Sequence, residues 1–242
     1  MATSGTVAFN LEIHEIIEEA YENCGMDLQK MSAQRLSTAR RSLDLLLQEW
    51  NNDSVNLWTL EQSTQSLSSG ANSYSLAADT IDVLDAVIRD SSSIDFPLHR
   101  MSIQEYLDVP NKTQEGKPTS YAVQRGVSTP TLYVWPDPPT SPVYTLVYYR
   151  IRQIQDSGVY SNNPDVPRRF LPALVYGLSY KLALKHPPKY EIGNDGRKVQ
   201  FDGVDPSHRD FLKMEYMGVF QAAKDADRER TSLYAIPSVG RR

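Results

Sequence analysis

The sequence has few of the residues and motifs on which catalytic and metal sites depend. One residue in 242 is a cysteine, Cys24, which excludes an intrachain disulfide and a zinc site built on several cysteines. None of the histidines is paired with another at the spacing of metal ligands. The chain carries no G-x-S-x-G elbow, Walker loop or G-x-G-x-x-G motif. We therefore expect no enzyme activity, no metal and no cofactor, and we interpret Cys24 as a buried thiol.

Excess positive charge and long apolar runs are missing as well. The 25 Lys and Arg residues are outnumbered by 30 Asp and Glu residues, giving a formal net charge of −5. A protein that binds nucleic acid on its own usually has a basic surface, so that class is a weak alternative. No apolar run approaches the ~18 residues that a membrane span needs. We expect a soluble protein with no membrane partner, made in a reducing cytoplasm.

Helical periodicity is the strongest pattern that is present. Apolar residues recur at a spacing of three and four residues in four long stretches, which predict helices over 9–24, 32–50, 165–185 and 206–228. The first helix is expected to begin at Asn10 and to bury Phe9. Asp165, with Pro167, and Asp205, with Pro206, are expected to begin the third and fourth.

The helix interiors also suggest how the helices pack. Gly177 in the third helix is expected to permit close approach of a neighbour. The fourth helix is expected to point these residues inward: Leu212, Tyr216, Val219, Phe220 and Ala223. The polar stretch 191–203 between these two helices is interpreted as a loop.

The centre of the chain has a different pattern. Runs rich in β-branched and aromatic residues, SYAVQRG, TLYVWPDPP and VYTLVYYRIRQIQ, are separated by glycine or proline and predict strands, as does part of TIDVLDAVIRD. A short helix capped by Ser102 is expected within 101–110. The fold class is therefore α+β: a four-helix bundle with an inserted antiparallel β unit and an extended C-terminal tail. We divide the chain at 1–54, 55–155, 156–230 and 231–242.

Three groups of residues are candidates for contacts with a partner. An acidic row on the first predicted helix, either a solvated face or a charged surface, consists of Glu12, Glu15, Glu19 and Glu22. Two basic doublets, suited to ion pairs within or between subunits or to phosphate, are Arg40-Arg41 and Arg168-Arg169. The last stretch, RERTSLYAIPSVGRR, places apolar residues and a basic end on what is otherwise interpreted as a loose tail.

Several stretches together resemble a known family. AYENCGM followed by LDLLLQEWNNDSVNLW resembles the opening helix pair of head-to-tail adaptors of tailed bacteriophages, also called head-completion or packaged-DNA stabilisation proteins. The central stretches, then DVPRRFLPALVYGLSYKLALKHP and DADRERTSLYAIPSVGRR, are similar to the larger members from short-tailed phages. The resemblance covers nearly the whole chain and lies in the order of the stretches, since none of them is diagnostic alone.

The resemblance implies a structural protein of the virion, made in the host bacterial cytoplasm and placed at the head-tail junction. Family members form a ring, usually of twelve subunits, below the portal protein. The ring retains the packaged double-stranded DNA, which passes through the channel without sequence-specific binding. It is also the platform for the tail nozzle or tube and for tail fibre proteins. Another tail-tube or nozzle connector is the alternative within the same class.

The resemblance implies that the C-terminal segment grips the portal, and the other candidate residues have roles compatible with such a ring. The tail would dock onto the portal through Leu233, Tyr234, Ile236, Pro237, Val239, Arg241 and Arg242. The acidic row would face the channel or a neighbouring subunit, and the arginine doublets would contact a subunit or DNA.

Overall fold

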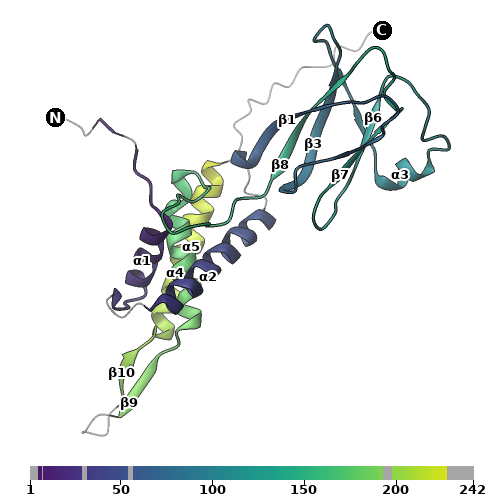
Figure 1. The fold of residues 1–242 in the computed structure, drawn as a ribbon. Helices are drawn as coiled ribbons and strands as arrows, with labels where there is room; N and C mark the ends of the chain where they lie inside the picture. The colour runs from purple at the N-terminus through teal and green to yellow at the C-terminus, as the bar shows by residue number, and fades with distance from the viewer. Residues whose placement is uncertain (1–4, 7, 29–31, 54–56, 193–197, 228–242) are drawn as a thin grey trace, which may run out of the picture. The chain divides into compact units, whose positions relative to one another are not determined.

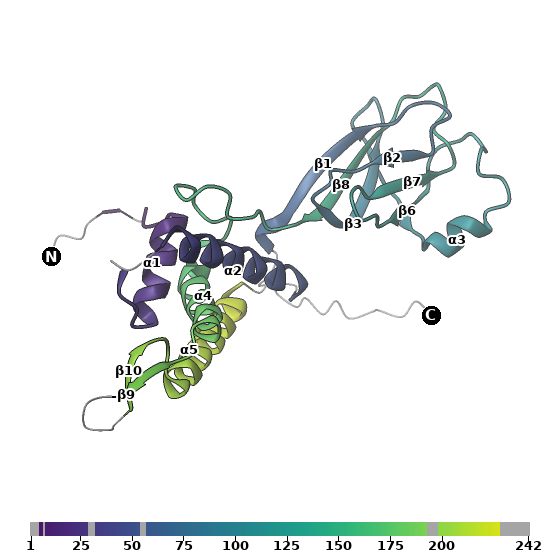
Figure 2. The ribbon, with the colours of Figure 1, turned by 60° about the horizontal axis from the view of Figure 1, so that its bottom comes forward.

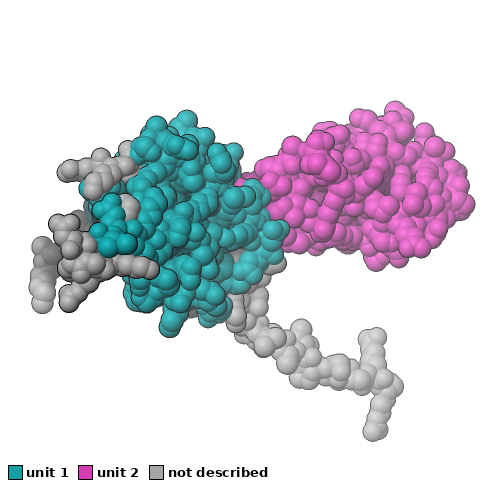
Figure 3. All heavy atoms as spheres, turned by 90° about the horizontal axis from the view of Figure 1, so that it is seen from below, with its two compact units in different colours: residues 1–57, 155–242 teal, residues 58–154 magenta. Residues whose placement is uncertain are grey.

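The fold is α+β, and the chain divides into two compact units. The computed structural model describes residues 5, 6, 8–28, 32–53, 57–192 and 198–227. One unit consists of Met1–Leu57 and Gln155–Arg242, and the other of Trp58–Ile154; Figure 3 colours them teal and magenta. The candidate docking tail, 231–242, lies outside the described residues. Each unit is described by itself below.

The first unit is built around one central helix. Its helices are α1 (Ile13–Asn23), α2 (Ala33–Asn52), α4 (Leu171–Lys185) and α5 (Pro206–Ala226), with a 3-10 turn at Arg168–Phe170 before α4. Helix α4 packs against α1, α2 and α5 (Figures 1 and 2). The core between them includes Trp50 of α2, which stacks on Phe220 of α5 with ring centroids 5.0 Å apart.

The predicted four-helix bundle is therefore wrong. A bundle needs four helices that each keep a polar face outward, but α4 is apolar almost all round. Its buried residues occupy most of its circumference: Leu171, Ala173, Leu174, Val175, Gly177, Leu178, Ser179, Leu182 and Ala183. The other three helices, α1, α2 and α5, are arranged around α4, and each of them contacts it. A strip at four-residue spacing stays wholly or partly exposed on α4: Pro172, Tyr176, Tyr180 and Leu184.

Two predicted helix starts are wrong, and both fail for the same reason. The Asn10 side chain accepts a hydrogen bond from the N–H of Leu11, at 3.1 Å, so it does not cap a helix. Helix α1 begins after Glu12, where a capping box pairs Glu12 with Glu15. Asp165 accepts the N–H of Gln155 at 3.0 Å, and α4 starts only at Leu171. In each case the side-chain oxygen accepts a hydrogen bond from a backbone N–H that does not belong to the first turn of the helix.

The other helix starts were predicted correctly. Asp205 caps α5 and Pro206 is its first residue. Ser32 caps α2 by accepting the N–H of Arg35 at 3.3 Å.

The stretch between α4 and α5 is a hairpin, which corrects the loop predicted there. Strands β9 (Lys189–Ile192) and β10 (Lys198–Asp202) pair antiparallel, with Ile192 opposite Lys198 and Tyr190 opposite Gln200. The strands alternate apolar with polar residues, but they are only four and five residues long and lie among polar residues, which hid the pattern.

The second unit consists of two four-stranded sheets. The first has the order β1 (Leu60–Ser66), β8 (Thr145–Arg152), β3 (Thr80–Arg89) and β4 (Asp95–Pro97). The second has the order β2 (Ser73–Ser75), β7 (Thr131–Trp135), β6 (Ser120–Gln124) and β5 (His99–Arg100). All pairs are antiparallel except β5–β6, which is parallel and departs from the predicted antiparallel unit.

One apolar core joins the two sheets. It takes Val83, Ile88 and Leu146 from the first sheet and Leu132 and Val134 from the second, all fully buried. Because side chains alternate along a strand, these residues place one face of each sheet inside this core. The short helix α3 (Ile103–Asp108) follows β5 and begins at Ser102, as predicted.

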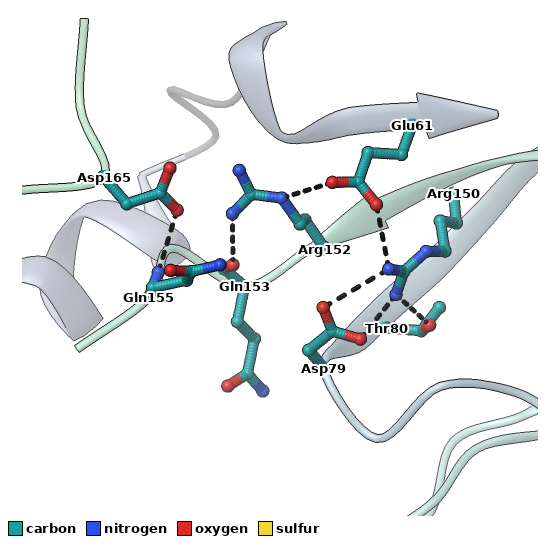
Figure 4. A network of polar contacts seen from close by, with 8 residues as sticks. All are labelled: Glu61, Asp79, Thr80, Arg150, Arg152, Gln153, Gln155 and Asp165. Carbon is teal, nitrogen blue, oxygen red and sulfur yellow. Dashed lines mark hydrogen bonds and ion pairs between the residues drawn. The ribbon is translucent and has the colours of Figure 1, made fainter. Parts of the chain in front are cut away.

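A cluster of charged residues holds three strands of the first sheet together (Figure 4). The Arg150 side chain, only 10% exposed, lies 2.9 Å from Glu61 of β1 and 2.5 Å from Asp79, and it also donates to Thr80. Arg152 contacts the same Glu61 at 2.7 Å. The hydrogen bond from Arg150 lowers the pKa of Asp79 below its ordinary value. A nearly buried guanidinium is stable here because carboxylates on both sides compensate its charge.

Candidate functional site

An apolar groove lies on the surface of the first unit, between α1 and the start of α4. It has a volume of about 440 Å³. Six of the residues lining it have apolar or aromatic side chains: Phe9, Leu11, Leu171, Pro172, Val175 and Tyr176. The others are Glu19, Asn23 and Arg168. Tyr176 and Pro172 belong to the exposed strip of α4, so the groove follows that strip.

Phe9 is the most conspicuous apolar residue of the groove. It was expected to be buried in the first helix, but that helix begins only at Ile13 and Phe9 is 70% exposed. An exposed phenylalanine beside an apolar groove leaves a continuous apolar surface in water. Such surfaces on soluble proteins usually mark contacts with another molecule.

Two of the candidate charged residues meet at this groove. Glu19 comes from α1 and Arg168 from the turn before α4, and both are exposed. Within the described part of the chain, no hydrogen bond or ion pair of either side chain is found. The groove thus has one negatively and one positively charged side chain beside apolar walls. This arrangement is suited to a contact with another protein in one defined orientation.

The rest of the acidic row has different surroundings. Glu15 accepts the N–H of Glu12 at 2.8 Å, and Glu12 lies 3.3 Å from Nδ1 of His14. These two glutamates therefore stabilise the start of α1. Glu22 is exposed on the same helix.

The remaining arginines of the doublets are used mainly within the chain. Arg40 donates to the carbonyl oxygen of Gly158 at 3.1 Å, and its guanidinium lies 5.6 Å from the ring centroid of Tyr160. Arg169 forms an ion pair with Asp227, the residue that ends α5. Arg41 is exposed. Of the four arginines, Arg168 is the one that the structure brings to the groove.

The outer face of α5 carries apolar residues that the sequence analysis missed. Phe211 is 51%, Met214 73% and Met217 59% exposed. They recur every three residues, on the side of the helix opposite the buried Leu212 and Ala223. A side chain added at Gly218 on this face would meet nothing within 4 Å. The three-residue spacing of these apolar residues could have been recognised in the sequence. It was overlooked because the apolar residues predicted to face inward on the same helix form a stronger pattern.

The described residues offer little for chemistry. Cys24 is buried, as predicted, and burial raises the pKa of its thiol to about 12, far from that of a nucleophile. No group of three or more His, Cys, Asp or Glu side chains in the described ranges is arranged to hold a metal ion. Among the helices described here, none is both long and apolar enough to span a membrane.

Comparison with known proteins identifies the family. The model of the SU10 adaptor protein family, a family of phage head-tail adaptors, matches residues 18–230 and so includes most of both units. No curated protein matches the chain. The match supports an adaptor and structural component of a phage particle. The chain therefore belongs to the SU10 adaptor protein family.

Proposed function

We propose that copies of this chain form the adaptor ring between the portal and the tail of a phage particle. The observation that carries the proposal is the family match, which extends over residues 18–230. The apolar groove supports it, because a subunit of an assembly must present surfaces that only another protein covers. By the resemblance to phage adaptors, the ring has twelve copies and serves as the platform for the tail nozzle or tube and for tail fibres.

The proposed ring also retains the packaged DNA. DNA must pass through such a channel during ejection, so its wall should bind the phosphate backbone weakly. Affinity for DNA falls as the number of Lys and Arg contacts falls, and the net charge of −5 accords with weak binding. Glu22, exposed on α1, is the residue of the acidic row that we assign to such a wall.

We further propose that residues 231–242 dock onto the portal protein. Four apolar residues supply the anchors: Leu233, Tyr234, Ile236 and Val239. Full burial of each would contribute about 1.5–3 kcal/mol, less the cost of ordering the segment. Pro237 reduces that cost by restricting the backbone, and Arg241 and Arg242 pair with acidic groups of the portal or with DNA. Repetition around a ring multiplies the effect of each tail.

Deletion of residues 231–242 tests this assignment. The truncated chain should keep the far-UV circular dichroism signal of its helices, because the deleted residues follow α5, the last helix among the described residues. It should no longer form a complex with purified portal rings in mass photometry, whereas the full chain should. Portal complexes of equal occupancy with both chains would refute the docking role of the tail.

A further inference from the structure

The groove and the outer face of α5 are two different unused surfaces on the same unit. We propose that they bind each other between neighbouring copies: the α5 ridge, formed by Phe211, Met214 and Met217, inserts into the groove between α1 and α4 of the next subunit. This inference rests on the proposed ring, and it names the surfaces through which the ring closes.

The α5 ridge has the form of a helix that binds in a groove. Its three side chains are 51–73% exposed and lie along one face of a helix of 21 residues. Anchors at this spacing are the means by which an amphipathic helix enters an apolar groove. The two methionines are flexible enough to fit an irregular wall, and Gly218 beside them allows close approach of a partner.

The groove supplies what such a ridge requires. Its walls are apolar and aromatic, and its volume of about 440 Å³ accommodates several side chains. Its lining residues come from α1, from α4 and from the segments that precede these two helices. Phe9 and Tyr176 are the aromatic residues that line it, and aromatic residues are enriched in protein interfaces.

Charge gives the contact a direction. The groove presents Arg168 and Glu19, both exposed. Beside the α5 ridge, Asp210 and Lys213 are exposed and lie one helical turn apart. In one orientation of the α5 ridge in the groove, Asp210 can pair with Arg168 and Lys213 with Glu19. In the reverse orientation, residues of like charge would face each other.

Two different complementary surfaces on one chain form a heterologous interface. Each copy offers a ridge to one neighbour and a groove to the other, so the contact repeats until the ring closes. A second copy is the occupant that the chain itself supplies in equal number, with matching shape and charge. Neither surface remains exposed to water once the ring is closed.

Cysteine cross-linking tests the contact. Met214→Cys and Pro172→Cys are made in separate chains; both positions are exposed, and the native Cys24 is buried. The matched control pairs Pro172→Cys with Leu107→Cys, a residue 64% exposed on α3 of the other unit. After mild oxidation, the 172–214 heterodimer should exceed the 172–107 heterodimer at least tenfold. Equal yields of the two would overturn the proposed interface.

Charge exchange provides a second test, which is read out with the same pair of introduced cysteines. In the 172–214 cross-linking pair, Arg168→Glu should lower the yield several-fold, and Asp210→Arg added in the partner chain should restore it. Failure of the second change to restore the yield, with both chains folded by circular dichroism, would contradict the charge pairing.

Portal rings separate this inference from the proposed function. The cross-linking is repeated with the portal present, and bound copies are counted by mass photometry. Portal-bound copies without the 172–214 cross-link would overturn the interface and leave the adaptor function standing. Cross-linked copies that never bind the portal would overturn the adaptor function and leave the interface standing. A portal or tail protein that cross-links to Pro172→Cys in place of a second copy would also overturn the inference.

Discussion

The packing around Gly177 gives the sharpest prediction about the first unit. A Cβ atom at this position would lie 2.8 Å from Cδ2 of Leu46 and 2.9 Å from Cε2 of Tyr216. Neither neighbour can easily move away. Leu46 is fully buried, and the hydroxyl of Tyr216 accepts a hydrogen bond from Nε1 of Trp50 at 3.0 Å. Any side chain at Gly177 must therefore displace Leu46 or Tyr216 from its packed position, or move α2 or α5 away from α4.

The size of the effect follows from two opposing contributions. Overpacking of a close contact lowers the free energy of unfolding by about 1–3 kcal/mol. Replacing a glycine within a helix raises it by about 0.5–1 kcal/mol. Gly177→Ala should therefore lower the free energy of unfolding by up to about 2 kcal/mol, and the larger Gly177→Leu by about 3 kcal/mol. Gly218→Ala is the matched control: its Cβ meets nothing within 4 Å, so it should stabilise the helix by about 0.5–1 kcal/mol.

Urea denaturation followed by circular dichroism at 222 nm measures these changes, because α1, α2, α4 and α5 all belong to this unit. With a denaturant slope of about 2 kcal/mol per molar, Gly177→Leu should move the midpoint down by roughly 1.5 M. An unchanged midpoint for Gly177→Leu would refute the close packing of α4 against its neighbours. A midpoint lowered equally by Gly218→Ala would show that helical glycines are required here for a reason other than packing.

Two further predictions concern buried groups. Arg150→Ala should destabilise the β unit by about 2–3 kcal/mol, less than the ~3–5 kcal/mol of a fully buried pair because Glu61 and Asp79 remain half exposed. Arg89→Ala breaks a pair that water screens, so it should destabilise the unit markedly less. Equal losses in urea denaturation monitored by tryptophan fluorescence would contradict the role of the buried cluster. Cys24 should react with a thiol reagent at pH 8 only after unfolding, because burial raises its pKa to about 12; rapid labelling of the native chain would show that the thiol is accessible.

The sequence predicted elements well where the decisive signal is local. Ser102 and Asp205 begin helices as expected, because each side-chain oxygen lies next to the N–H groups that it caps. The strands β6, β7 and β8 follow from alternating β-branched and aromatic residues between prolines and glycines.

The predictions failed where distant segments decide the outcome. Asp165 has the right residue type for a helix cap, yet it accepts an N–H ten residues earlier in the chain. The apolar pattern of α4 was read as one face of a bundle, but burial on nearly all sides makes it a central helix. A helix pattern cannot distinguish these two arrangements without its neighbours.

The candidate site was only partly predictable for the same reason. Glu19 and Arg168 were named from the sequence as candidates for contacts, but their meeting in one groove depends on the packing of α1 against α4. The exposure of Phe9 was not predicted, because it depends on the position at which α1 begins. When a surface is formed by segments far apart in the sequence, no local sequence pattern shows that their residues lie together.

Imaging of the chain bound to its portal by electron cryomicroscopy tests the central claim most directly. The account predicts a closed ring of this chain below the portal, expected to contain twelve copies, with each α5 ridge in the groove of the next subunit. Portal particles that carry no such ring, or that carry separate copies without contact to one another, would contradict it.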